Sequence, residues 1–160
     1  MQRRTLLSGF VLSSLAAMAG CTTSPPPDQV KSDVALIASG LSGVLTVLSG
    51  LPAGTIPPDT FGRAQAIIDD IRTNAASISQ AITANPDTVQ TISSLVSTLS
   101  ALLTPFFPAA PAVGLAVKAA LVLLPIVLAA VGKAPAAATA APTMTPADAR
   151  AVLTSSAAAK

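Results

Sequence analysis

The stretch that decides the fold is PAVGLAVKAALVLLPIVLAAVG, residues 111–132, in which Lys118 is the only charged side chain. Eleven of these residues are Val, Leu or Ile. A helix that is apolar on nearly every side must be covered by other apolar elements or by lipid. We therefore keep three hypotheses open for it: a buried helix of a bundle, a transmembrane helix, and a surface helix covered by a partner.

Length and hydrophobicity do not choose between these hypotheses. About 20 apolar residues span a bilayer. On an insertion scale, the Val, Leu and Ile residues of this stretch contribute about −3 to −6 kcal/mol, and a central Lys costs about +2.5 to +3.5 kcal/mol. Lys118 lies towards one end of the stretch, where a long side chain can reach the interface and lower that cost.

The preceding sequence supplies apolar stripes that could cover such a helix. Apolar residues recur three and four positions apart, the spacing of a helix face, over residues 28–49, 60–84 and 86–104. The stripes consist of Val30, Val34, Ile37, Leu41, Val44 and Leu48; of Ile68, Ile71, Ala75, Ile78 and Ile82; and of Val89, Ile92, Val96, Leu99 and Leu103. Pro and Gly punctuate the gaps, and no segment alternates like a strand. The sequence predicts an all-α domain over 28–133, a small bundle of about four helices whose central member is 112–131.

The sequence changes character after Lys133. Residues 134–160 are rich in Ala, Pro and Thr, which is typical of a low-complexity tail outside the folded domain. Within this tail, residues 146–157 could form a short helix. Its apolar residues are few, so we expect it to pack weakly on the bundle.

The amino-acid inventory excludes several classes of function. The chain has no His, Glu, Trp or Tyr and one Cys. Catalytic triads that use His are therefore excluded, and zinc or transition-metal sites lack their usual ligands. Beyond residue 20, seven basic side chains balance seven Asp, so no basic patch indicates nucleic acid. We predict neither catalysis nor a bound metal or cofactor.

The densest charge cluster is Arg63, Asp69, Asp70 and Arg72. Adjacent carboxylates could hold a divalent cation or serve in acid–base chemistry. However, neighbouring residues of a helix point about 100° apart, and Asp69 and Arg72 have the spacing of an ordinary ion pair within a helix. We interpret the cluster as a solvated helix face.

Small residues recur every four positions in the first predicted helix, at Ala35, Ser39 and Gly43. This spacing places them on one face and lets another helix approach closely. Two interpretations stay open: a face for helix–helix association in an oligomer or at a membrane, and a weakly polar surface.

The first 20 residues show the three zones of a secretory signal. Arg3 and Arg4 are basic, residues 6–17 are apolar, and small or flexible residues precede Cys21. The apolar zone of about a dozen residues is shorter than a membrane-spanning helix. We therefore predict that residues 1–20 are a cleaved signal peptide in which Arg3 and Arg4 are recognised.

The sequence Met18-Ala19-Gly20-Cys21 resembles the lipobox of bacterial lipoprotein precursors. The resemblance implies that Cys21 receives a diacylglycerol, that the leader is cut before it, and that the new amino group is acylated. Residues 21–27 would then be the lipidated Cys and a Pro-rich tether. Arg3-Arg4-Thr5-Leu6-Leu7 also resembles a twin-arginine export signal, and an ordinary secretion signal explains the two arginines equally well.

These features predict an envelope lipoprotein with a structural or interaction role, anchored by Cys21 and facing the periplasm. Thr at position 22 in place of Asp favours the outer membrane over the inner membrane in this family. The expected partners are the bilayer and either a second copy or another envelope protein. The alternative is a two-membrane tether in which 112–132 is a transmembrane helix. That layout, and only the layout, resembles the single-chain spanins of phages.

Overall fold

The structure is a computed structural model that describes residues 26–133 and 144–158. Within these ranges 81% of the residues are helical and no strand occurs, which confirms the all-α class. The elements are α1 (Pro27–Ser49), α2 (Pro58–Gln80), α3 (Pro86–Leu103), the 3₁₀ turn η1 (Thr104–Phe106), α4 (Pro111–Ala130) and α5 (Pro146–Ala158). The predicted signal peptide, Cys21 and the tail residues 134–143 lie outside the described residues.

All five of these α-helices begin at a proline. Proline suits the first helical position because its missing N–H has no acceptor there in any case. The caps agree with this assignment: Asn85 accepts a hydrogen bond of 2.9 Å from the Asp87 backbone N–H at the start of α3, and Thr145 accepts one of 3.2 Å from the Asp148 N–H at the start of α5. The residues at each helix start thus determine where the helix begins, and the predicted starts lie within two residues of the observed ones.

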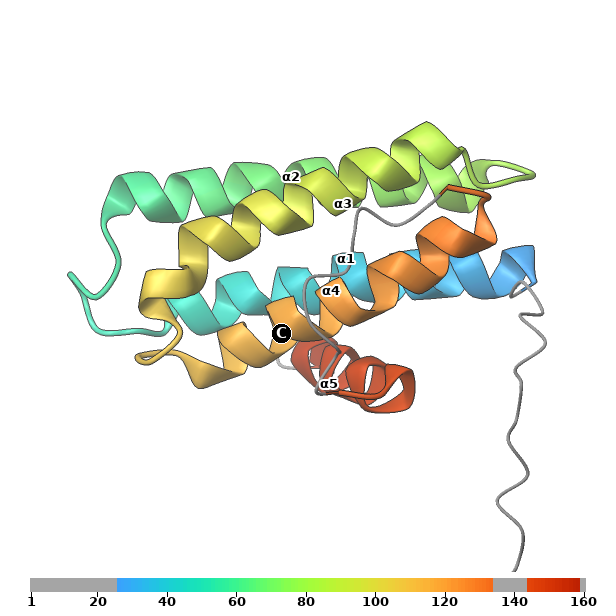
Figure 1. The fold of residues 1–160 in the computed structure, drawn as a ribbon. Coiled ribbons are helices and arrows are strands. Elements are labelled where there is room, and N and C mark those ends of the chain that lie inside the picture. Colours follow the sequence, from blue (N-terminus) through green and yellow to red (C-terminus); the bar gives the residue numbers. More distant parts are fainter. Residues whose placement is uncertain (1–25, 134–143, 159–160) are drawn as a thin grey trace, which may run out of the picture.

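Helices α1 to α4 form a closed ring in chain order. Each packs on the next, and α4 packs back on α1; consecutive helices run antiparallel (Figure 1). Helix α5 contacts α1 and α4 and lies on the side away from α2 and α3 (Figure 1). Helices α1 and α4 are therefore the middle layer of the molecule, between the α2–α3 pair and α5.

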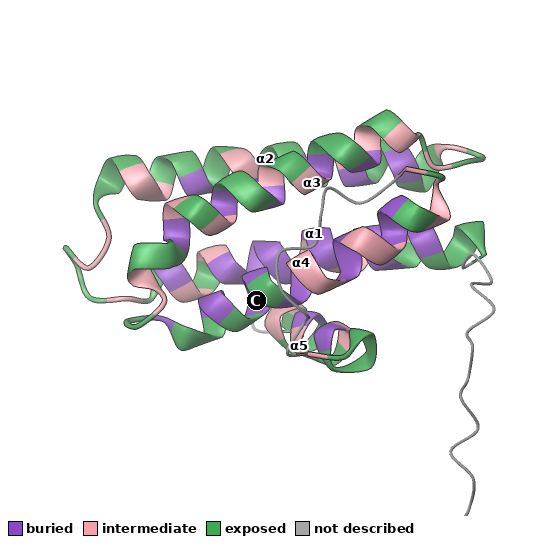
Figure 2. Cartoon of the chain, in the orientation of Figure 1, coloured by how far each residue is buried: buried purple, intermediate pink, exposed green. Residues whose placement is uncertain are grey.

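Burial follows this layering. Helix α1 buries eleven residues and α4 buries ten, whereas α2 and α3 bury five each. The buried positions face inwards from every helix (Figure 2). The apolar stretch 111–132 is thus covered by α1, α3 and α5, and it shares the central position with α1.

Helix α5 is the main difference from the predicted bundle of about four helices. Ala149 and Leu153 of this helix are fully buried, and the α5 backbone comes so close to α1 that a Cβ atom added to Gly43 would lie 1.9 Å from the Ser156 carbonyl oxygen. The sequence predicts weak packing because α5 carries few large apolar side chains. The missing bulk is offset by glycines on its partner, which let the two backbones approach.

The end of α2 is a second difference. Residues 60–84 are predicted to be helical, but α2 ends at Gln80 and Ala81 is extended. Five residues then separate α2 from Pro86, the first residue of α3. Ile82 consequently leaves the predicted apolar stripe and is 94% exposed, whereas Ile78, one turn earlier, is 1% exposed.

Two matched substitutions test this boundary. We expect Ile78→Ala to lower the free energy of unfolding by about 2–5 kcal/mol, the usual cost of truncating a buried Ile. Ile82→Ala should change it by less than about 0.5 kcal/mol, because an exposed side chain has little packing to lose. Urea denaturation followed by circular dichroism measures both. Equal losses for the two variants would mean that α2 continues past Gln80.

Candidate functional site

The predicted lipidation residue, Cys21, and the predicted signal residues Arg3 and Arg4 lie outside the described residues. The structure does give the start of the bundle: α1 begins at Pro27, six residues after Cys21 in the sequence. Six residues span at most about 20 Å when fully extended. A lipid on Cys21 would therefore hold the N-terminal end of α1 within that distance of a membrane.

The most buried charge of the described chain is Asp33, on α1. Its carboxylate accepts two hydrogen bonds of 2.7 Å from Arg150 of α5, Nε to Oδ1 and Nη2 to Oδ2. The side chain of Asp33 is 5% exposed and that of Arg150 is 33% exposed. The hydrogen bonds to Asp33 raise the pKa of Arg150, desolvation opposes this rise, and Coulomb attraction to Asp33 adds to it. The result is a bidentate ion pair, called the clamp below, between residues 117 positions apart.

Sequence analysis did not find this ion pair, although one signal for it existed. Asp33 falls on the face of α1 that carries the buried residues Val30 and Val34. A charge on an apolar helix face needs a partner, since an unpaired buried charge is very costly. The partner's identity could not be predicted, because Arg150 belongs to a segment that the sequence assigns to the tail.

Two glycines of α1 also lie beneath α5. A Cβ atom added to Gly40 would lie 2.6 Å from Leu153 Cδ2, and one added to Gly43 would strike the backbone of Ser156. The interpretation of Gly43 as part of a helix-association face therefore applies within this chain, to the pairing of α1 with α5. The other two members of the predicted face, Ala35 and Ser39, line a different surface.

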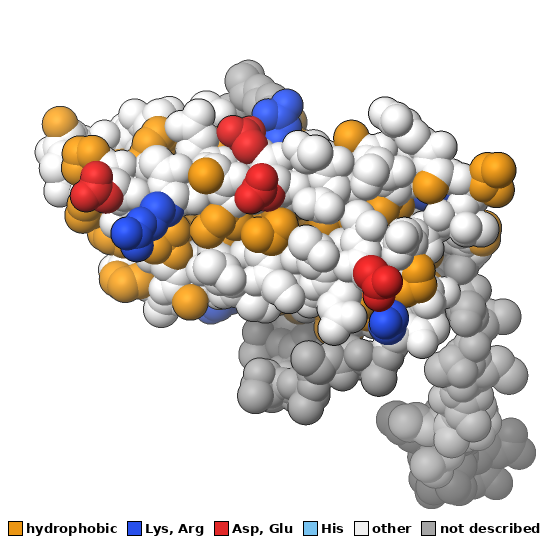
Figure 3. All heavy atoms as spheres, turned by 90° about the horizontal axis from the view of Figure 1, so that it is seen from above, with side chains coloured by type: hydrophobic (Ala, Val, Ile, Leu, Met, Phe, Trp, Pro, Cys, Tyr) orange, Lys and Arg blue, Asp and Glu red, His pale blue; other side chains and the backbone are white. Residues whose placement is uncertain are grey.

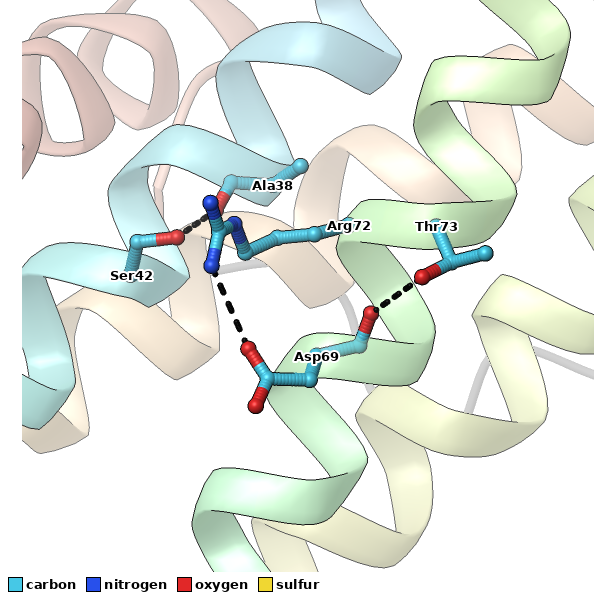
Figure 4. A network of polar contacts seen from close by, with 5 residues as sticks. All are labelled: Ala38, Ser42, Asp69, Arg72 and Thr73. Carbon is cyan, nitrogen blue, oxygen red and sulfur yellow. Dashed lines mark hydrogen bonds and ion pairs between the residues drawn. The ribbon is translucent and has the colours of Figure 1, made fainter.

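That surface is a groove of about 330 Å³ between α1 and α2. Its lining consists of Ala35, Ala38, Ser39, Ser42, Arg72, Ala75, Ala76 and Ser79. The lining hydroxyls are already used: Ser39 and Ser42 each donate to the carbonyl four residues earlier, at 2.8 Å. Figure 4 shows this bond for Ser42, together with the contact between Arg72 and Asp69.

The predicted charge cluster on α2 does not form a chemical site. Arg72 Nη1 lies 3.2 Å from Asp69 Oδ1, and both side chains are more than half exposed, which confirms the pairing expected from their spacing. Arg63 and Asp70 are also exposed. Among the described residues, no group of three or more potential metal ligands comes together. A second hollow, of about 260 Å³ where α1 joins α2, has no titratable side chain in its lining.

Beyond Asp87 in its first turn, the outer face of α3 is uncharged, and its exposed hydroxyls are satisfied internally. Hydroxyl donors bond to the carbonyl four residues earlier at 2.9–3.2 Å; they are Thr91, Ser94, Ser97 and Thr98. Such bonds lower the cost of moving a hydroxyl out of water. Seen from the α2–α3 side, the molecule shows few charged side chains among a mostly neutral surface (Figure 3).

Three helical segments are long and apolar enough to cross a membrane: α1 with a mean hydropathy of 1.5, Pro86–Phe106 with 1.2, and α4 with 2.4. In the fold, α1 and α4 are neighbours. All charged residues of α1 lie in its first two turns, at Asp28, Lys31 and Asp33, and α4 carries only Lys118. The middle layer of the bundle is thus a pair of helices with the hydropathy of membrane spans.

Two ion pairs of the structure should differ sharply in their effect on stability. We expect Arg150→Ala to lower the free energy of unfolding by about 3 kcal/mol, because it leaves the buried Asp33 carboxylate without its partner. Asp69→Ala breaks an exposed pair and should cost less than about 1 kcal/mol. Urea denaturation of both variants measures the difference. An equally small loss for Arg150→Ala would show that α5 does not shield Asp33 from water.

No protein-family model, curated protein or solved structure matches this chain.

Proposed function

We propose that this chain is an envelope lipoprotein whose helical bundle has a structural or interaction role, and that acylated Cys21 anchors the closed bundle without any membrane-spanning helix. The observation that carries the proposal is the burial of α4. Ten residues of this helix are buried against the rest of the bundle, so its apolar surface is covered without a second membrane. The lipobox-like sequence ending in Cys21 then supplies the attachment, six residues before α1.

The proposed role is non-catalytic. It rests on the inventory of the chain, which has no His or Glu and whose single Cys would carry the lipid. The Asp and Arg side chains that come closest together, Asp33 with Arg150 and Asp69 with Arg72, neutralise one another as ion pairs. We assign the protein to the periplasmic side of a membrane, and the Thr at position 22 favours the outer membrane.

The partners that we propose besides the bilayer are a second copy or another envelope protein. The hydroxyl-rich face of α3, which is uncharged beyond Asp87, supports this, because its internally bonded hydroxyls reduce the cost of burying it against another protein. Nucleic acid is not proposed as a partner, since the charges beyond residue 20 balance.

The anchor is tested by labelling and fractionation. We expect the wild-type protein to incorporate labelled palmitate and to stay with membranes. The comparison is a Cys21→Ser variant in which an ordinary secretion leader replaces residues 1–20, so that cleavage does not depend on Cys21. This variant should lose the label and appear in the soluble periplasmic fraction, because no other segment needs lipid to be covered.

The same fractionation tests the alternative of a two-membrane tether. In that alternative, 112–132 lies in the inner membrane, and its mean hydropathy of 2.4 is the supporting observation. The Cys21→Ser variant would then resist extraction with alkaline carbonate, as integral proteins do. Resistance would replace the proposal of a lipid anchor without a membrane-spanning helix with the tether, whereas extraction into the soluble phase rejects the tether.

A further inference from the structure

The face of the α1–α4 pair that points away from α2 and α3 is covered by α5 (Figure 1). Beyond Asp33, α1 carries no charge from residue 34 to its end at Ser49, and α4 carries only Lys118, which is exposed. Both helices have the length and hydropathy of membrane spans. Helix α5 therefore lies over a pair of helices whose composition would suit lipid as well as protein.

The hold of α5 on this surface depends on fit more than on apolar area. Only Ala149 and Leu153 of α5 are fully buried. Its other contacts run along both α1 and α4, and they include the half-buried Val152, the clamp between Asp33 and Arg150, and the close backbone approach at Gly43. Buried ion pairs fix an orientation and stabilise less than apolar packing of the same volume. The ring of α1 to α4 is closed by its own contacts, and none of these contacts passes through α5.

We propose that α5 is a displaceable cover, and that the α1–α4 face beneath it is a second, lipid-binding surface for which a bilayer competes with α5. A bilayer that binds only the open form shifts the population towards it by its difference in affinity for the two forms. The inference goes beyond the lipid anchor and does not require it. An acyl chain on Cys21 would add to the effect by raising the local concentration of bilayer.

The charge distribution favours a bilayer over a second copy as the occupant. The three charged residues of α1 are confined to its first two turns, so an α1 helix in contact with lipid can keep Asp33 among the headgroups. The uncharged remainder of α1 and the apolar face of α4 then meet acyl chains. A protein occupant would have to match the Asp33 carboxylate with a cation, as Arg150 does now.

A single methyl group can displace α5 without weakening the ring. A Cβ atom at Gly43 would lie 1.9 Å from the Ser156 carbonyl oxygen, whereas one at Gly62 of α2 meets nothing within 4 Å. Alanine is also a better helix former than glycine. Gly43→Ala and Gly62→Ala are therefore the same substitution in two helices, and only the first strikes α5.

Both substitutions are made in the mature chain, residues 21–160, with Cys21→Ser so that no acyl chain contributes. Hydrogen exchange of the α5 amides reports whether α5 has been displaced, and flotation with phosphatidylcholine vesicles reports lipid binding. We expect Gly43→Ala to expose α5 to exchange, to keep its overall helicity, and to float with vesicles at least about tenfold more than Gly62→Ala.

A reversible cross-link provides the opposite test in a single polypeptide. A Cβ atom at Gly40 would lie 3.0 Å from Leu153 Cβ, about half an ångström below the range usual in disulfides, so the two helices must separate slightly to form the bond. In the same Cys21→Ser chain, Gly40→Cys with Leu153→Cys should hold α5 in place when oxidised. We expect vesicle binding after reduction and none before it.

Three results would overturn the proposal. The first is displacement of α5 in Gly43→Ala with no more vesicle binding than in Gly62→Ala. The second is equal vesicle binding by the oxidised and reduced cross-linked chain, and the third is dimerisation of Gly43→Ala in place of vesicle binding. If Gly43→Ala leaves α5 protected from exchange, the cross-linked chain decides. None of these results bears on whether Cys21 is acylated, so this proposal and the proposed function can fail separately.

Discussion

The structure depends on the need to cover α4. A helix with a mean hydropathy of 2.4 presents apolar side chains in nearly every direction, and water cannot be its neighbour on more than one side. The chain meets this constraint by placing α1, α3 and α5 around it. The same constraint explains α1, which lies in the middle layer beside α4 and is itself of membrane-span hydropathy. Helices α2 and α3, with neighbours on one side only, have a single apolar stripe and a polar outer face.

The cover on the α5 side differs in kind from the cover on the α2–α3 side. Helices α2 and α3 contribute rows of buried aliphatic residues, five buried positions each. Helix α5 contributes two buried side chains and relies on a bidentate ion pair and on glycines in its partner. Aliphatic packing tolerates small shifts of a helix, whereas a bidentate clamp holds in one orientation. The bundle is thus closed by aliphatic packing on one side and by a specific, polar contact on the other.

This division also explains what could be predicted from the sequence. The starts of the helices and the apolar stripes of the first four helices could be predicted because they depend on prolines, caps and spacing within about a dozen residues. Ile82 was misplaced because the end of α2 is set by the turn that brings α3 alongside, which is a tertiary requirement. The partner of Asp33 could not be found because Arg150 is 117 positions away in a segment of low apolar content. Small residues that let two helix backbones pack closely do not produce the hydrophobic pattern by which a buried helix is predicted.

The proposed anchor and the α5-covered face that we propose to bind lipid could act on the same bilayer. The N-terminus of α1 and the C-terminus of α4 lie at one end of the bundle (Figure 1), where Lys133 binds Asp87 at 3.1 Å, so a lipid on Cys21 would bring this charged end to the headgroups. Helix α1, 23 residues long, measures about 35 Å, and a helix with its side chains is about 10 Å across. The six-residue tether, with a reach of about 20 Å, is therefore longer than the thickness of α5. A bundle held at that end can turn its α5 side towards this membrane, and displacement of α5 would then bring α1 and α4 into contact with it.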